Sequence, residues 1–146
     1  MLKRILVCCF SSFCLLFCMG CKKHEFYYMQ NKEEIESIEI VQVLTTSYTQ
    51  YEIVPLLLIE DQETFLSDFS KLKWTTVFSY SYEIKDGSNA IKFQYRNGDY
   101  ELITNIGMAK YYHAENRYSP ISGDHTCDEE EYQQLLAKYL EGETCV

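Results

Sequence analysis

Thiols can undergo the widest range of reactions among the side chains of this protein, because a cysteine can form a disulfide, bind a metal or accept a covalent modification. Four of the seven cysteines lie in an apolar leader, where they act as small hydrophobic side chains: Cys8, Cys9, Cys14 and Cys18. Cys21 follows Gly20 at the end of that leader, and only Cys127 and Cys145 lie beyond it. An even pair of cysteines in an exported protein favours a disulfide.

The spacing of Cys127 and Cys145 leaves their pairing open. A helix over residues 128–140 would be about 20 Å long at a rise of roughly 1.5 Å per residue. The tail from Glu141 to Cys145 spans at most about 17 Å, so closure needs an abrupt reversal, which Gly142 can provide. The spacing is therefore compatible with two alternatives, a disulfide between Cys127 and Cys145 and two free thiols.

Histidines and carboxylates are the other candidates for chemistry. His113 and Glu115 are two residues apart, so on a strand they would share a face and could serve as the acid and base of a hydrolase. No nucleophile motif or phosphate-binding glycine loop accompanies them. His125, Cys127 and Asp128 lie close together in the sequence, but their spacing matches no zinc pattern. We therefore predict no catalytic set, no metal site and no cofactor.

The first 20 residues predict a signal peptide. Lys3 and Arg4 form a short positive region, and residues 5–19 are apolar apart from two serines. Gly20 supplies a small residue at the cleavage position. The uncharged run over residues 5–20 has 16 residues, fewer than the roughly 18–20 of a spanning helix. A cleaved export signal is therefore favoured over a leader that remains attached as a membrane-spanning helix.

The end of the leader resembles the signal of bacterial lipoproteins, in which a Leu-x-x-Cys sequence with Gly or Ala before the Cys directs lipidation. Gly20 and Cys21 match this pattern, whereas Cys18 stands where leucine is usual. The resemblance implies cleavage before Cys21 and a diacylglyceryl group on its sulfur. Two hydrocarbon chains are enough for stable membrane anchoring. An ordinary secretory signal, which would release a soluble protein, is the alternative.

The charge beyond the leader is strongly negative. Lys3 and Arg4 are the only charges before Cys21, so 22 acidic and 11 basic residues follow it, giving a net charge of −11. A chain with this balance repels phosphate backbones and anionic lipid surfaces. We therefore exclude nucleic-acid binding and expect a protein partner to present a basic face.

Hydrophobic patterns predict a single α+β domain over residues 33–146, preceded by a lipidated Cys21 and a tether over residues 21–32. The aromatic residues 26–28 of that tether could alternatively form a first strand. Pro55 places the second strand of the domain at a sheet edge or a bulge. Strand-like runs and one hairpin are predicted over residues 35–44, 51–60, 73–84, 90–104 and 108–121.

The hairpin has the clearest local signal in the chain. Asn97-Gly98 between two alternating runs predicts a two-residue turn, because both turn positions need positive φ. The expected register pairs Phe93 with Leu102 on one face of the hairpin. It pairs Gln94 with Glu101 on the other face.

Two amphipathic helices are predicted, over residues 61–72 and 128–140. Asp61 and Asp128 stand at their N-cap positions, and Glu131 completes a capping box in the second helix. The order of elements indicates an antiparallel sheet of about five or six strands, packed on one face by the two helices.

The "FLSDFSKL" helix, the "IKFQYRNGDYELI" hairpin and the "DEEEYQQLLAKYL" helix together resemble small uncharacterised exported proteins of bacteria. That resemblance implies a fold and a compartment, and no activity.

Two groups of tyrosines, Tyr80/Tyr82 and Tyr111, Tyr112 and Tyr118, are expected to form either an exposed contact surface or cross-strand packing.

The leader, the negative charge and the missing catalytic set together predict a lipoprotein at the bacterial cell envelope, with a non-enzymatic, lipid-anchored domain that binds another macromolecule. The exported hydrolase and a purely structural envelope component are the alternatives.

Overall fold

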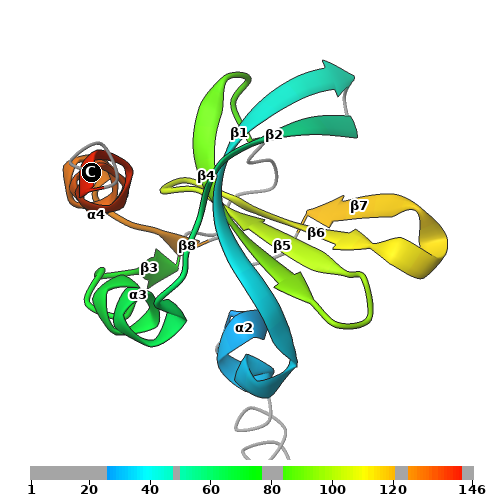
Figure 1. Cartoon of the computed structure of the whole chain (residues 1–146). Coiled ribbons are helices and arrows are strands. Elements are labelled where there is room, and N and C mark those ends of the chain that lie inside the picture. The colour runs from blue at the N-terminus through cyan, green and yellow to red at the C-terminus, as the bar shows by residue number, and fades with distance from the viewer. Residues whose placement is uncertain (1–25, 48–49, 77–83, 121–124, 143–146) are drawn as a thin grey trace, which may run out of the picture.

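The structure is a computed structural model that describes residues 26–47, 50–76, 84–120 and 125–142. Its main element is a six-stranded antiparallel sheet with the strand order β2-β1-β4-β5-β6-β7 (Figure 1). Its strands are β1 (Ile35–Ser47), β2 (Gln50–Leu58), β4 (Ser88–Tyr95), β5 (Tyr100–Ile103), β6 (Met108–Tyr112) and β7 (Arg117–Pro120). The predicted α+β class with an antiparallel sheet is confirmed.

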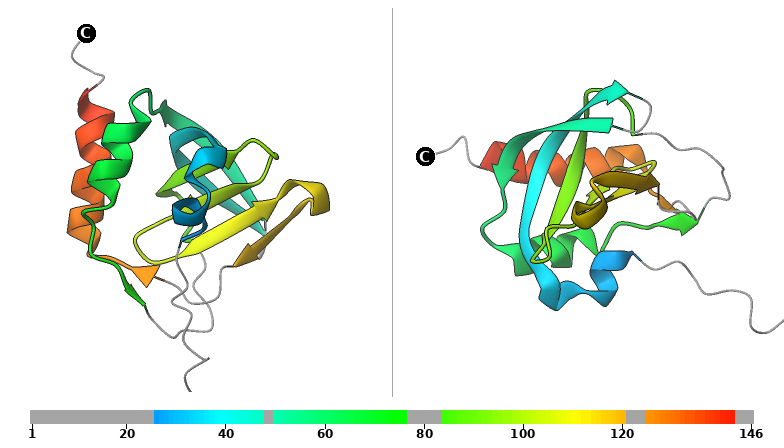
Figure 2. Two further views of the ribbon diagram at one scale, coloured as in Figure 1. Left: turned by 90° about the horizontal axis from the view of Figure 1, so that it is seen from below. Right: turned by 90° about the vertical axis from the view of Figure 1, so that its right-hand side faces the viewer.

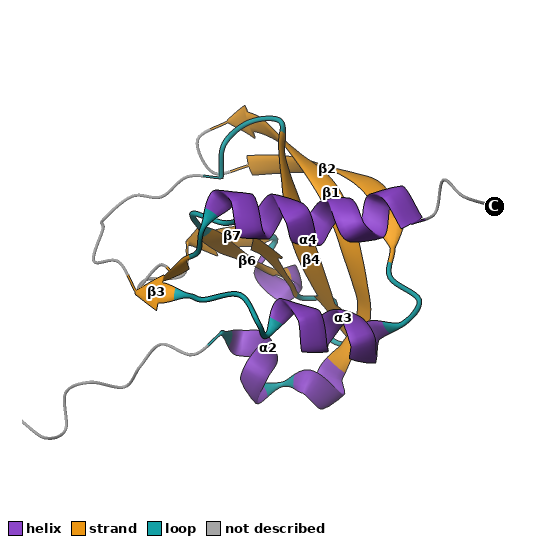
Figure 3. Ribbon diagram, turned by 90° about the vertical axis from the view of Figure 1, so that its left-hand side faces the viewer, coloured by secondary structure: helices purple, strands orange, loops and turns teal. Residues whose placement is uncertain are grey.

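Two helices pack on one face of this sheet, as predicted: α3 (Gln62–Phe69) and α4 (Glu129–Gly142). Figures 2 and 3 show them side by side across the same face. The Asp61 carboxylate accepts a hydrogen bond from the first turn of α3, and the Asp128 carboxylate does the same for α4, each at 3.0 Å. The core between helices and sheet includes Phe65, Phe69, Tyr132, Leu135 and Leu136 from the helices, with Ile38, Ile40, Ile91 and Phe93 from the strands.

The sheet curves until its two edge strands meet. The Tyr118 hydroxyl on β7 donates a hydrogen bond of 3.3 Å to the Tyr51 carbonyl oxygen on β2, and the two rings lie 4.9 Å apart. The face turned away from the helices therefore holds a second, smaller core: Val41, Val43, Ile84, Ala90, Leu102 and Ala109.

Pro55 lies where its residue type predicts. The strand β2 is at the edge of the sheet, and its register with β1 shifts between the Ile40–Leu57 and Val41–Pro55 pairs. Proline cannot donate a backbone hydrogen bond to a neighbouring strand, which confines it to such positions. An edge and a bulge, the two alternatives in the prediction, occur together.

The segment after residue 25 differs from its prediction. Residues 21–32 were expected to form a tether, with a strand as the alternative for the aromatic residues, whereas the structure forms a short helix, α2 (Tyr27–Gln30), and a 3₁₀ turn, η1 (Lys32–Glu34). The side chains of Phe26 and Tyr28 are buried in the main core. Burying two aromatic rings stabilises the segment against the sheet, so the folded unit already includes Phe26.

The hairpin between β4 and β5 also differs from its prediction. The backbone N–H of Tyr95 bonds to the Asp99 carbonyl oxygen, and Gly98 takes a φ of 87° in a loop one residue longer than expected. The register therefore moves by one residue, and Phe93 lies opposite Glu101 instead of Leu102. This shift turns the Glu101 side chain onto the helix-covered face of the sheet.

The remaining predicted elements are only partly described. Residues 73–84 were expected to form a strand, and the structure places a short strand, β3 (Thr75–Thr76), there, paired with β8 (His125–Thr126). Residues 77–83 lie outside the described residues, as do the leader, Cys21 and Cys145. Residues 108–121 were expected to form a strand and its turn, and the structure forms β6, a 3₁₀ turn, η2 (His113–Glu115), and a second strand, β7.

Candidate functional site

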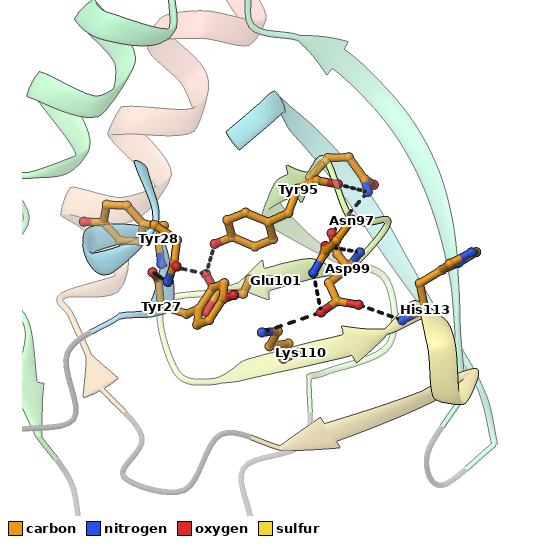
Figure 4. A network of polar contacts seen from close by, with 10 residues as sticks. Tyr27, Tyr28, Tyr95, Asn97, Asp99, Glu101, Lys110 and His113 are labelled. Carbon is orange, nitrogen blue, oxygen red and sulfur yellow. Dashed lines mark hydrogen bonds and ion pairs between the residues drawn. The ribbon is translucent and has the colours of Figure 1, made fainter. Parts of the chain in front are cut away.

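A buried carboxylate lies beneath α2. Glu101 on β5 is 0% exposed, and its Oε2 accepts hydrogen bonds from the Tyr95 hydroxyl at 2.6 Å and from the Tyr28 backbone N–H at 3.2 Å. Figure 4 shows these groups converging from three separate elements. We call the residues that surround Glu101, together with Glu101 itself, the α2 network: Tyr27, Tyr28, Tyr95, Asp99, Glu101 and Lys110.

Lys110 supplies the positive charge of the α2 network. It stands opposite Glu101 on β6 and is 6% exposed. Its Nζ lies 3.3 Å from the centroid of the Tyr27 ring and 3.8 Å from Oδ2 of Asp99. A cation over an aromatic face is attracted by the ring quadrupole, most strongly where water is excluded. Lys110 therefore binds α2 through Tyr27 while it balances the two carboxylates.

Burial shifts the pKa of Glu101. Loss of water raises the pKa of this carboxyl group, and the hydrogen bond from Tyr95 and the charge of Lys110 oppose that rise without cancelling it. Oε1 of Glu101 has no hydrogen-bond partner among the described residues. Because folding raises this pKa, Glu101 stabilises the fold most below its ordinary pKa, and that contribution is lost as pH rises through the folded pKa.

Burial also shifts the pKa of two tyrosines in the α2 network. Burial and the nearby Glu101 charge raise the pKa of Tyr28 to about 12, and the same two causes raise the pKa of Tyr95 further. Both hydroxyl groups therefore stay protonated at physiological pH. A substrate cannot contact a carboxylate that solvent does not reach, so the chemical effect of this arrangement is to fasten α2 to β4, β5 and β6.

His113 and Glu115, the predicted acid–base pair, lie together in η2 and are both exposed. The Glu115 carboxylate accepts a hydrogen bond from Arg117 Nε. The His113 backbone N–H donates to Oδ1 of Asp99 at 2.9 Å, and Figure 4 shows its ring pointing away from the α2 network. The pair therefore sits on an exposed turn rather than on one face of a strand.

Cys127 lies between β8 and α4, where its backbone N–H donates to the Asn105 carbonyl oxygen at 2.9 Å. Cys145 is outside the described residues, so the two alternatives, a disulfide with Cys127 and two free thiols, both stay predictions. Burial, followed by the charges of Glu131 and Asp128, raises the pKa of the Cys127 thiol to about 12. Within the described ranges, no group of three or more histidine, cysteine or acidic side chains is placed to hold a metal ion.

The raised pKa gives Cys127 a testable property. We expect iodoacetamide at pH 8 to modify it at least about a hundredfold more slowly in the reduced, folded protein than in urea, because the thiolate is the reactive form and an ordinary thiol has a pKa near about 8.5. Peptide mass spectrometry over a time course measures the two rates. Equal rates would show that the folded structure does not protect this thiol.

The tyrosine clusters serve cross-strand packing where the structure describes them. The ring of Tyr111 stacks on that of Tyr100 with centroids 4.8 Å apart, and Tyr118 packs against both. All three are half-buried beside the smaller core. Tyr112 lies on the other face near Lys110, and Tyr80 and Tyr82 lie outside the described residues.

Comparison with protein-family models, with curated proteins and with solved structures finds no match to this chain. Among the residues that the structure describes, no helix is both long and apolar enough to cross a membrane. The function proposed below rests on the residues of this chain and on their geometry.

Proposed function

We propose that this protein is a bacterial lipoprotein, exported through the leader over residues 1–20 and anchored in the envelope by lipid on Cys21. Its folded domain is non-enzymatic and binds another macromolecule, a protein with a basic face. The leader supports the anchoring, because its apolar run is too short to span a bilayer and ends in Gly20-Cys21.

The position of α2 is the structural observation that carries this proposal. Five residue steps separate Cys21 from Phe26, the first described residue, and they reach at most about 18 Å when fully extended. The segment then enters the core, where the α2 network fastens it to three strands. A lipid on Cys21 would therefore hold the domain close to the membrane, with the α2 side nearest to it.

The surface charge supports a basic partner. Acidic side chains are exposed where β1 begins and where β2 passes into α3, including Glu36, Glu60 and Glu63. Such a surface attracts cationic partners over distances of about 10 Å at moderate ionic strength and repels anionic membranes. The hydrolase alternative has less support, because Glu115 pairs with Arg117 on an exposed turn.

Replacing Cys21 with alanine tests the anchor. We expect the unaltered chain, expressed in bacteria fed a clickable palmitate analogue, to carry the label and to sediment with membranes. The C21A chain should lose the label and its membrane association, because no other thiol can take the lipid at that position. The matched control is Cys127→Ala, which should leave both unchanged. Label that persists in C21A would exclude lipidation of Cys21.

A pull-down tests the partner. The domain, immobilised and exposed to solubilised envelope proteins, is expected to retain a basic protein at low salt and to release it at high salt, because salt screens exposed charges. Mass spectrometry identifies the retained protein. Retention of no salt-sensitive protein from its own envelope would contradict the binding function.

A further inference from the structure

The outer side of β2 is an unpaired strand edge. The sheet order ends at β2, so no strand in the described part of the chain pairs with its outer side. The Ile59 backbone N–H, just after the strand, donates to the Ile38 carbonyl oxygen of β1 at 2.9 Å. Backbone groups alternate in direction along an antiparallel strand, so the N–H and C=O of Leu58 point outward.

The side chains on this edge are apolar and exposed. Leu56 is 45% exposed and Leu58 is 56% exposed, while Leu57 between them packs against the main core. A strand edge with unpaired backbone groups can template pairing with another chain, and exposed apolar side chains beside it add contact area. The segment over residues 56–58 therefore has the properties of a surface that another chain covers.

The charges beside this edge are all negative. Residues 50–63 contain no lysine or arginine, and their acidic residues are Glu52, Glu60, Asp61 and Glu63. Pairing of β2 with the β2 of a second copy would bring these acids together, which is unfavourable. A strand that carries lysine or arginine would instead place opposite charges side by side.

The rest of β2 limits how long the added strand can be. Pro55 has no N–H to donate, and the register shift beside it twists the strand at that point. Before Pro55, the Tyr51 carbonyl oxygen already accepts a hydrogen bond from Tyr118 of β7. The edge that remains open therefore runs over residues 56–58 and leads toward Glu60.

We propose that the β2 edge over residues 56–58 binds an extended, basic segment of the partner protein as an additional strand of the sheet. Backbone hydrogen bonds would provide the affinity, Leu56 and Leu58 would contact apolar side chains, and the acids beside the strand would select lysine or arginine. This inference rests on the proposed binding function and names the site and the chemistry of its ligand.

A short synthetic peptide provides the test. The probe is a fluorescein-labelled octapeptide of alternating lysine and valine, titrated with the protein while fluorescence anisotropy is measured. We expect saturable binding that weakens at least about tenfold, equivalent to roughly 1.4 kcal/mol, in the Leu56→Lys/Leu58→Lys double variant. The control is Met29→Lys, because Met29 is 46% exposed and belongs to α2 instead of β2. That variant should bind the probe as the unaltered protein does.

A second probe does not depend on folding of a variant. The same octapeptide with a methyl group on every backbone nitrogen keeps its charges but loses the N–H donors on both edges of a strand. Strand pairing predicts that this peptide binds at least about tenfold more weakly than the unmodified one. Equal binding of the two peptides, or equal binding by the double variant, would overturn the inference.

The outcomes separate this inference from the proposed function. An envelope protein retained equally by the unaltered domain and by the double variant would remove β2 as the site while the binding function stands. Probe binding at β2 without retention of any basic envelope protein would contradict the binding function and leave the strand edge as a peptide-binding surface.

Discussion

Replacing Tyr28 with alanine is expected to lower the free energy of unfolding by about 3–5 kcal/mol, the range for deleting a fully packed aromatic ring. The Tyr28 ring is 3% exposed, stacks on Phe93 with centroids 4.8 Å apart and lies 5.4 Å from Phe69. Urea unfolding followed by fluorescence of Trp74, the single tryptophan, measures the change. Such a loss is a large part of the roughly 5–15 kcal/mol that stabilises a typical domain.

Met29 provides a matched control for Tyr28. It is the next residue of α2 and its side chain is 46% exposed. The Met29→Ala variant should therefore change the free energy of unfolding by less than about 0.5 kcal/mol. If Tyr28→Ala lowered the free energy of unfolding no more than Met29→Ala, residues 26–30 would be a tether. That result would contradict the claim that α2 holds the domain close to its anchor.

Replacing Lys110 with methionine is expected to destabilise the protein by about 3 kcal/mol at pH 7. Methionine preserves most of the volume of lysine but removes the buried charge that lies near both Asp99 and Glu101. Removing one member of a buried charge pair leaves its partner uncompensated in a medium of low dielectric constant. The cation over the Tyr27 ring is lost as well. Chemical denaturation of both proteins at a series of pH values measures the difference.

The effect of Lys110→Met should shrink in acid. The charge of Lys110 lowers the pKa of Glu101, so its removal raises that pKa further above the ordinary value. A raised pKa stabilises the fold below the unfolded pKa and costs stability above the folded one, so protonation of Glu101 should recover part of the loss when the pH is lowered from 7 to an acidic value. An equal loss at both pH values would contradict electrostatic coupling between the two residues.

Lys92 serves as the control for Lys110. It lies on β4, which β5 separates from the strand of Lys110, and forms an ion pair of 3.4 Å with Glu39, where both side chains retain contact with water. The Lys92→Met variant should therefore cost less than about 1 kcal/mol, with little dependence on pH.

The elements with strong local signals could be predicted from the sequence. Asp61 and Asp128 mark the starts of α3 and α4, because a short acidic side chain before a periodic run bonds to the free N–H groups of the first turn. Pro55 marks the edge position of β2, because it lacks a donor. Each of these positions is decided by groups within three or four residues.

The α2 network could not be predicted, because its members depend on a register that local sequence left ambiguous. A two-residue turn at Asn97-Gly98 would pair Phe93 with Leu102 and leave Glu101 outside the main core. The longer loop pairs Phe93 with Glu101 instead and buries a carboxylate. Apolar matching within the hairpin favours the first register. In the second register, contacts with α2 and Lys110 compensate for the cost of burying the Glu101 carboxylate.

The short helix α2 lacked a sequence signal of its own. Its four residues are too few for a helical period, and Tyr27 and Tyr28 are as compatible with a strand. The helix exists because tertiary contacts bury Phe26 and Tyr28. Three aromatic residues at positions 26–28, where a lipoprotein tether is usually rich in glycine and serine, were the one available hint that the segment packs.

The mass of the N-terminal peptide, measured on protein extracted with detergent from bacterial membranes, tests the central claim most directly. A lipid-anchored envelope domain predicts a chain that begins at Cys21 and carries a diacylglyceryl group on that residue. A chain that begins at Met1, recovered from the cytosol with an unmodified Cys21, would contradict the anchor, the compartment and the envelope partner together.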